Sequence, residues 1–190
     1  KKWMKPTRVW PTMGTVGTRA WIQYQPRGRS LIVAPWNFPL NLCFGPMVSA
    51  LAAGCTVILK PSEMTPSVST VMAEVIADTF KPDEVALFEG ALQTSQVLLD
   101  LPFDHIFFTG SPAVGKIVMT AAARHLTSVT LELGGKSPTI VCADADLDHA
   151  VAGVLYGIFS SSGESCVAGS RAFVHASVYD EFKRRLLVGV

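Results

Sequence analysis

The sequence is short of the features that mark several large classes of protein. Its 16 lysines and arginines are balanced by 15 aspartates and glutamates, so the formal net charge of +1 gives no field that would attract nucleic acid or an anionic surface. No apolar run is long enough to span a bilayer, and the first residues do not resemble a signal peptide. There is no internal repeat and no low-complexity tract. We therefore expect neither a nucleic-acid partner nor a membrane span.

Cysteine is scarce and dispersed. The four cysteines, Cys43, Cys55, Cys142 and Cys166, form no C-x-x-C pair and share no metal-ligand spacing with the four histidines. Hydrophobic residues make up 49% of the 190-residue chain, which is enough for a buried core without disulfide support. We expect no metal site, unpaired thiols and a reducing, cytoplasmic compartment.

Short apolar runs alternate with helical patterns from Ser30 onward. The runs, which predict strands, cover residues 31–34, 56–59, 85–88, 105–108, 129–131 and 139–142. Thr65-Pro66 and Ser111-Pro112 each place a capping residue before a proline at the first helical position. Strands that are apolar throughout and separated by helices predict an α/β fold, an open, mostly parallel Rossmann-like sheet with helices on both faces. Ligands of such sheets bind beyond the carboxyl ends of the strands.

Two motifs follow predicted strands and carry polar side chains. In Pro35-Trp36-Asn37-Phe38-Pro39 the prolines fix an extended turn, and the Asn37 amide can donate to a developing oxyanion or satisfy turn backbone. In Lys60-Pro61-Ser62-Glu63 a lysine and a carboxylate can hold the hydroxyls of a ribose or form a solvated loop.

A third motif, Phe107 to Lys116, reads as a strand, a tight turn and a helix start, which suits a pyrophosphate. It nearly matches the P-loop pattern G-x-x-x-x-G-K-[ST], but Ile117 replaces the Mg²⁺-binding hydroxyl and Pro112 removes a backbone N–H. A P-loop nucleotidase therefore ranks second. The G-x-G-x-x-G fingerprint is absent, so a dinucleotide site here would be of an unusual kind.

Cys166 differs from the other three cysteines, which lie in apolar runs where a thiol is inert. It sits in a loop of serines and glycines, where an exposed thiol among backbone amides can be activated as the thiolate. Glu132 closes a predicted strand beside Gly134, and it can act as a general base or cap a turn. A soft nucleophile and a carboxylate on a nucleotide-binding sheet favour thiol-based redox catalysis.

Taken together, these motifs resemble the NAD(P)-dependent aldehyde dehydrogenase superfamily in order and approximate spacing, from about residue 31 to 169. The resemblance implies that Cys166 attacks an aldehyde, that Asn37 and the Cys166 backbone N–H stabilise the oxyanion, and that Glu132 activates the hydrolytic water. The cofactor would be NAD or NADP, with NAD favoured because the Glu63 carboxylate repels a 2′-phosphate. The cofactor-binding residues implied are Val33, Pro35, Trp36, Lys60, Ser62, Glu63, Gly110, Ser111, Val114, Leu133 and Gly134.

The resemblance also implies a domain plan. Residues 1–29 would be an N-terminal segment with an oligomerisation-type hairpin, 30–145 an incomplete dinucleotide-binding domain, and 146–190 the truncated start of a second α/β, catalytic domain. Full-length members of the family are more than twice as long. The partners expected are a small-molecule aldehyde, of the aromatic or medium-chain class, and further copies in a homodimer or homotetramer of the full-length protein.

Two positions depart from the family pattern. Ser161 and Glu164 stand where family members usually carry Asn and Gln, five and two residues before the cysteine. A carboxylate this close to Cys166 disfavours the thiolate. A non-catalytic remnant of a dehydrogenase therefore stays open as a further alternative, and we do not expect the isolated 190 residues to be fully active.

Overall fold

The computed structural model describes residues 5–190. Contacts divide the chain into two compact units: unit 1 takes the chain up to Thr109 together with Lys116–Leu131, and unit 2 takes Gly110–Gly115 and Glu132–Val190. This division falls earlier in the chain than the boundary expected after residue 145, and the extents of the functional domains stay a prediction. None of the helices within residues 5–190 is both long and apolar enough to cross a bilayer.

Unit 1 is built around a five-stranded sheet. Its strands are β3 (Arg29–Val33), β4 (Thr56–Lys60), β5 (Val85–Leu87), β6 (His105–Gly110) and β7 (Ser128–Leu133), in the spatial order β5-β4-β3-β6-β7. β3 pairs in parallel with both β4 and β6, and β4 with β5. Counted along the chain the order is 3-2-1-4-5, so the direction of winding reverses between β3 and β6. The expected Rossmann-like α/β fold is confirmed.

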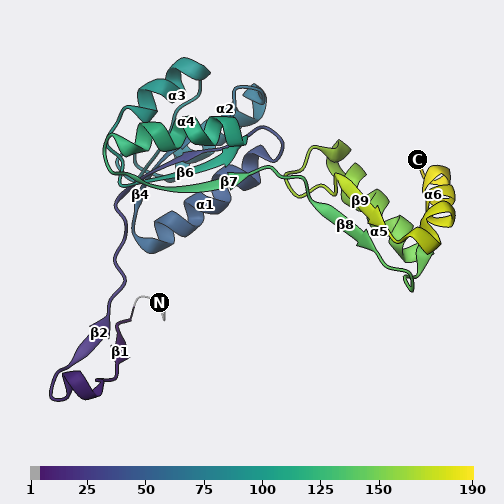
Figure 1. Cartoon of the computed structure of the whole chain (residues 1–190). Coiled ribbons are helices and arrows are strands. Elements are labelled where there is room, and N and C mark those ends of the chain that lie inside the picture. Colours follow the sequence, from purple (N-terminus) through teal and green to yellow (C-terminus); the bar gives the residue numbers. More distant parts are fainter. Residues whose placement is uncertain (1–4) are drawn as a thin grey trace. The chain divides into compact units, whose positions relative to one another are not determined.

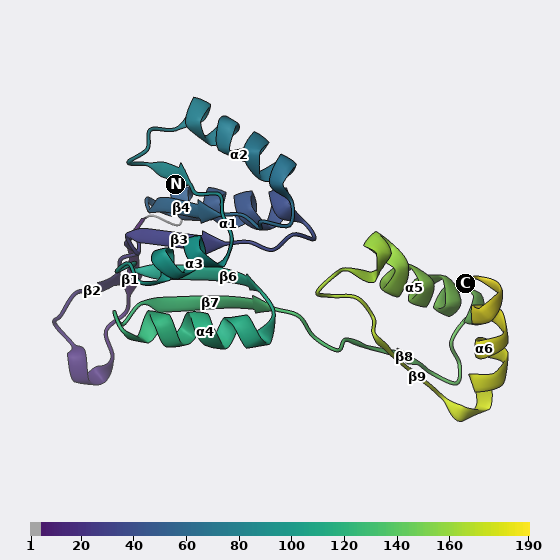
Figure 2. The same ribbon diagram turned by 90° about the horizontal axis from the view of Figure 1, so that it is seen from above.

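The helices of the sheet are α1 (Pro39–Ala53), α2 (Pro66–Thr79), α3 (Leu92–Leu99) and α4 (Pro112–Ala123). Figure 1 shows α3 and α4 on one side of the sheet and α1 on the other, and α2 contacts α1 and β5 (Figure 2). This arrangement follows from right-handed crossovers on either side of the point where the winding reverses. Pro66 and Pro112 are the first residues of their helices, as the sequence predicts.

The central strand is buried on both faces. Leu31 and Ile32 are neighbours in β3, so their side chains point to opposite faces, yet they are 0% and 1% exposed. Ile32 belongs to a core cluster with Cys43 and Leu59. Burial raises the pKa of the Cys43 thiol to about 12, so this cysteine is an inert packing group.

A hairpin precedes the sheet. β1 (Thr7–Val9) pairs antiparallel with β2 (Ala20–Ile22), joined through a 3-10 turn at Met13–Thr15. Its large apolar side chains are exposed, with Trp10 75% and Trp21 60% exposed.

Unit 2 pairs two parallel strands with two helices. The elements are β8 (Pro138–Val141), α5 (Leu147–Phe159), β9 (Arg171–Val174) and α6 (Tyr179–Val188), with 3-10 turns at Ser160–Gly163 and Ala176–Val178. A small core of Val141, Val151, Val154 and Phe182 holds them together. Asp146 caps α5: its carboxylate accepts from the backbone N–H groups of Asp148 (3.0 Å) and His149 (3.2 Å).

Candidate active site

Parallel pairing brings two of the predicted motifs to one edge of the sheet. Val33 and Lys60 are register partners at the carboxyl ends of β3 and β4, and the Ala34 N–H donates to the Lys60 carbonyl at 3.1 Å. The loop that carries Pro35, Trp36 and Asn37 therefore leaves the sheet beside the loop that carries Ser62 and Glu63. Val33, Pro35 and Asn37 are partly buried and Trp36 is exposed.

The second loop holds a charged pair. The buried Lys60 ammonium donates to the Glu63 carboxylate at 3.0 Å, and the side chain of Lys60 is 4% exposed against 51% for Glu63. The backbone N–H of Glu63 and then the Lys60 ammonium lower the pKa of Glu63, so this carboxylate is ionised at neutral pH. The loop is braced by the buried Ser69 hydroxyl, which donates to the Ser62 carbonyl at 3.1 Å. Because Lys60 is buried and Glu63 is exposed, it is the Glu63 carboxylate that this pair presents to the solvent.

The third motif closes β6 and opens α4. β6 ends at Gly110, the Ser111 hydroxyl accepts from the Val114 N–H at 3.3 Å, and the Ser111 carbonyl accepts from the Gly115 N–H at 2.9 Å. Ser111 therefore caps the helix, and Val114 is 44% exposed on its first turn.

Thr109 is a polar group that sequence reasoning missed. It precedes Gly110 at the carboxyl end of β6 and is 7% exposed, and its hydroxyl has no hydrogen-bond partner among the residues that the structure describes. A buried hydroxyl without a partner marks a place where a ligand or water supplies one. The only signal in the sequence is the position of this threonine directly before the Gly-Ser turn.

In unit 2, Cys166 lies in a loop with an unusual entry. Ser161 (φ 52°, ψ 40°) and Ser162 (φ 58°, ψ 24°) adopt the left-handed region, and Gly163 follows with φ 74°. The turn is closed by the Glu164 N–H, which donates to the Ser161 carbonyl at 3.0 Å. A Cβ at Gly163 would lie 2.9 Å from the Ile158 carbonyl, so this position requires glycine.

The exit of the same loop is also fixed, since the Gly169 N–H donates to the Gly157 carbonyl on α5 at 3.0 Å. Between entry and exit, Cys166 is exposed. The thiol is therefore reachable by a small electrophile, unlike that of the buried Cys43 or Cys55. The expectation was wrong for Cys142, which lies just beyond the end of β8 and is exposed as well.

Glu132 occupies the position expected for it. It is the next-to-last residue of β7 and is exposed, Leu133 is partly buried, and Gly134 is exposed just beyond the strand. The catalytic and cofactor-binding roles of these residues stay predictions. Within residues 5–190 no three His, Cys, Asp or Glu side chains gather as metal ligands would.

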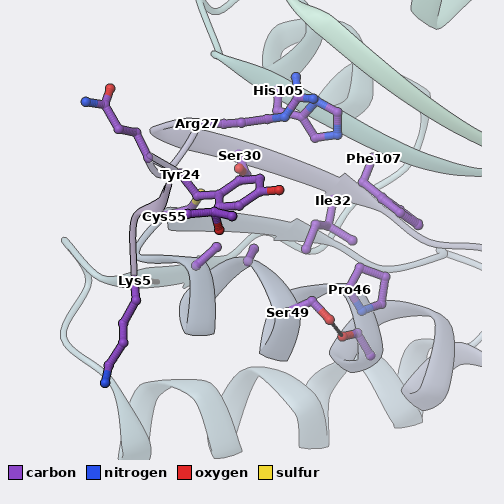
Figure 3. Close-up of a pocket in the computed structure, with 15 residues that line it drawn as sticks. Lys5, Tyr24, Arg27, Ser30, Ile32, Pro46, Ser49, Cys55, His105 and Phe107 are labelled. Atoms are coloured by element: carbon purple, nitrogen blue, oxygen red, sulfur yellow. Dashed lines mark hydrogen bonds between the residues drawn. The ribbon is translucent and has the colours of Figure 1, made fainter. Parts of the chain in front are cut away.

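A large cavity of unit 1 lies elsewhere. It has a volume of about 860 Å³ and lies between α1 and strands β3 and β6, and none of the predicted site residues lines it (Figure 3). Ser30 and His105 place it at the amino ends of β3 and β6, opposite to the edge where ligands of doubly wound sheets bind. We therefore place the candidate site at the motifs.

His105 in this cavity is held by structural hydrogen bonds. Its Nδ1 lies 2.8 Å from the Ser128 hydroxyl and its Nε2 3.0 Å from the Thr130 hydroxyl, both on β7. Arg27 Nη1 donates to the same Ser128 hydroxyl at 2.6 Å. Burial, and then the charge of Arg27, lowers the pKa of His105. The histidine thus ties β6 to β7 in its neutral form.

Comparison with known proteins gives one consistent result. The profile of the Aldehyde dehydrogenase family matches residues 4–189. The chain is 44% identical to the 4,4'-diaponeurosporen-aldehyde dehydrogenase of Staphylococcus aureus over 95% of its own length and 39% of the relative's. It is 42% identical to the dimeric NADP-preferring aldehyde dehydrogenase of Mus musculus, over 97% of the chain and 41% of that protein.

Solved structures agree. The substrate-bound state of Staphylococcus aureus AldH matches with a TM-score of 0.94 and 41% identity, over 99% of this chain and 41% of that one. The NAD+ complex of the aldehyde dehydrogenase from Bacillus cereus matches with a TM-score of 0.89 and 34% identity, over 99% and 39%. The chain thus spans about two fifths of the proteins that it matches. It belongs to the aldehyde dehydrogenase family.

Proposed function

We propose that the protein oxidises an aldehyde to a carboxylic acid with NAD(P)+, with Cys166 as the nucleophile. The observation that carries the proposal is the exposed thiol of Cys166, in a loop fixed at its entry and its exit, in a chain that matches the family over residues 4–189. Glu132 is proposed as the general base and Asn37 as the oxyanion donor, on the motifs that each of them belongs to.

The groups at the strand ends fit a dinucleotide. The ionised Glu63 and the buried Lys60 suit the hydroxyls of a ribose, and the unpaired hydroxyl of Thr109 at the end of β6 suits a polar ligand group. We assign the cofactor to the following residues: Val33, Pro35, Trp36, Lys60, Ser62, Glu63, Gly110, Ser111, Val114, Leu133 and Gly134. When bound, the nicotinamide supplies the hydride acceptor. NAD is favoured over NADP because the Glu63 carboxylate repels a 2′-phosphate.

The proposed steps follow from the chemistry of a thiol and an aldehyde. The Cys166 thiolate adds to the carbonyl carbon, and the resulting oxyanion accepts from the Asn37 amide and the Cys166 backbone N–H. Loss of hydride from that carbon restores the carbonyl and leaves a thioester on Cys166. Glu132 then takes a proton from a water molecule while the oxygen of that water attacks the thioester carbonyl. The C–S bond breaks, which releases the carboxylic acid and returns Cys166 to the thiolate.

We also propose a substrate class, an oligomeric assembly and a compartment. The resemblance favours an aromatic or medium-chain aldehyde. The exposed apolar side chains of the β1–β2 hairpin, Trp10 and Trp21 among them, suit an oligomerisation surface of a homodimer or homotetramer. All four cysteines are free, which supports a reducing, cytoplasmic location.

The test compares the whole protein with its Cys166→Ala variant, with aldehyde-dependent reduction of NAD+ and NADP+ followed by the absorbance of the reduced nicotinamide. We expect Cys166→Ala to abolish the signal and Cys142→Ala, which removes the other exposed thiol, to retain it. Absence of signal from the unaltered protein would favour the non-catalytic remnant, and ATP hydrolysis would favour the P-loop reading.

A further inference from the structure

The backbone that leads to Cys166 is the most strained segment of unit 2. Within residues 5–190, only Leu126, Ser161 and Ser162 adopt positive φ without being glycine, and two of the three are adjacent and lie four and five residues before the thiol. Left-handed backbone is unfavourable for an L-residue because its Cβ crowds the following carbonyl oxygen. Such strain persists only where the surrounding structure imposes it, and it gathers at functional sites.

Local hydrogen bonds hold the strained turn in place. The bond from the Glu164 N–H to the Ser161 carbonyl closes the turn across the left-handed residues Ser162 and Gly163, and Gly163 is packed against the Ile158 carbonyl. Because the loop is tied again at Gly169, the entry turn sets the direction from which the chain approaches Cys166.

The identity of the residues decides how firmly the turn is held. Asparagine and glycine adopt the left-handed region most readily, serine less so, and β-branched residues scarcely at all. The side chains of Ser161 and Ser162 are exposed, so a substitution there changes the backbone preference without disturbing packing.

We propose that Ser161 and Ser162 are positioning residues, whose left-handed turn presents the Cys166 thiol and sets its reactivity. The inference rests on the proposed role of Cys166 as nucleophile. Two serines make the turn marginal, so part of the population relaxes out of it and withdraws the thiol from its reactive placement. A residue that favours the left-handed region raises the reactive fraction, and one that disfavours it lowers that fraction.

The experiment uses the whole protein and two readouts. One is the rate at which iodoacetamide alkylates Cys166, followed by mass spectrometry of its peptide across pH; the other is the single-turnover rate of nicotinamide reduction. We expect Ser161→Asn and Ser162→Asn to raise both rates by about two- to fivefold, and Ser161→Val to lower both by about tenfold, without change in the KM for the cofactor.

Two controls separate positioning from stability. Ser160→Asn changes the preceding serine, which has an ordinary φ of −51°, and should leave both rates unchanged. Leu126→Asn relieves left-handed strain (φ 53°) in unit 1, and should raise the Tm without altering either rate.

The proposal falls if the Ser161 variants shift only the Tm, as Leu126→Asn does, while alkylation and single turnover stay at the unaltered rates. If Ser161→Val does not fold, the alkylation and single-turnover rates of Ser161→Asn alone test the proposal. A different outcome separates the two proposals. If the unaltered protein oxidises no aldehyde but Cys166 is still alkylated faster in Ser161→Asn than in the unaltered protein, the proposed function fails and the positioning role stands.

Discussion

Glu164 is the residue whose chemistry most directly opposes the proposed reaction. It stands two residues before Cys166, where family members usually carry Gln, and its negative charge would oppose the negative charge that forms in the proposed addition step. We expect Glu164→Gln to leave turnover intact or to raise it at neutral pH, measured as aldehyde-dependent nicotinamide reduction in the whole protein. Glu164→Asp keeps the charge and serves as the matched control. A large loss of turnover in Glu164→Gln alone would contradict this view of the carboxylate.

Glu63 is expected to set the choice of cofactor. Its own N–H and the Lys60 ammonium hold the pKa of this carboxyl down, so it is charged at neutral pH. Glu63→Gln removes the charge that repels a 2′-phosphate, and we expect the KM for NADP+ to fall by about tenfold relative to that for NAD+. Glu74→Gln, on α2, removes a distant carboxylate as a control. An unchanged ratio of the two KM values would assign the selectivity elsewhere.

At the level of single residues, the sequence indicated the motif side chains because their types and order are specific. It could not indicate Thr109, since a threonine at a strand end is ordinary until its hydroxyl is seen to be buried without a partner. Nor could it indicate the left-handed turn at Ser161 and Ser162. Serine does not require positive φ, and the turn is imposed by hydrogen bonds at both ends of the loop.

The β6–β7 pair contains a group that makes the fold sensitive to acid. The pKa of His105 lies below its ordinary value of 6.5, first because of burial and then because of Arg27, so the folded chain favours the neutral ring. The unfolded chain binds the proton more readily, so stability is lost as the pH falls below about 6.5. We expect the Tm of His105→Gln to fall less than the Tm of the unaltered protein when the pH is lowered from about 7 to about 5.5.

The matched control is His149→Gln, which replaces an exposed histidine on α5. On acidification its Tm should fall by as much as that of the unaltered protein. If His105→Gln and His149→Gln respond alike in thermal unfolding at the two pH values, the acid sensitivity does not reside in the link between β6 and β7.

Elements were predictable where a local rule fixes them. The prolines at 66 and 112 begin α2 and α4 as the sequence predicts, and α5 likewise begins directly after a capping residue, Asp146. The apolar residues of α1 do not recur at a clear helical period, so their spacing does not predict this helix. It begins at Pro39 and ends at Ala53, and the φ of 91° at Gly54 lets the N–H of this glycine reach the carbonyls of Ala50 and Leu51. The glycine therefore marks where α1 ends, although apolar spacing does not mark the helix itself.

On the scale of the whole molecule, alternation of strands and helices predicted the fold class but not the strand order. The order β5-β4-β3-β6-β7 depends on which way each crossover turns, and it decides which strand ends become neighbours. The cavity beside α1 was not predicted either, because it depends on how far one helix covers the sheet. Motif order, by contrast, was sufficient to indicate the family.

The extent of the chain leads to a prediction for the protein as a whole. The 190 residues span 39% and 41% of the two curated relatives described above, so most of the length of those proteins has no counterpart in them. We expect the purified 190-residue chain to show little aldehyde-dependent nicotinamide reduction beside the whole protein, under equal conditions and with a panel of aldehydes and both cofactors. A cooperative thermal transition in the short chain is the control, since it shows that loss of activity is not loss of the fold. Turnover equal to that of the whole protein would mean that the motifs of these residues suffice for the reaction.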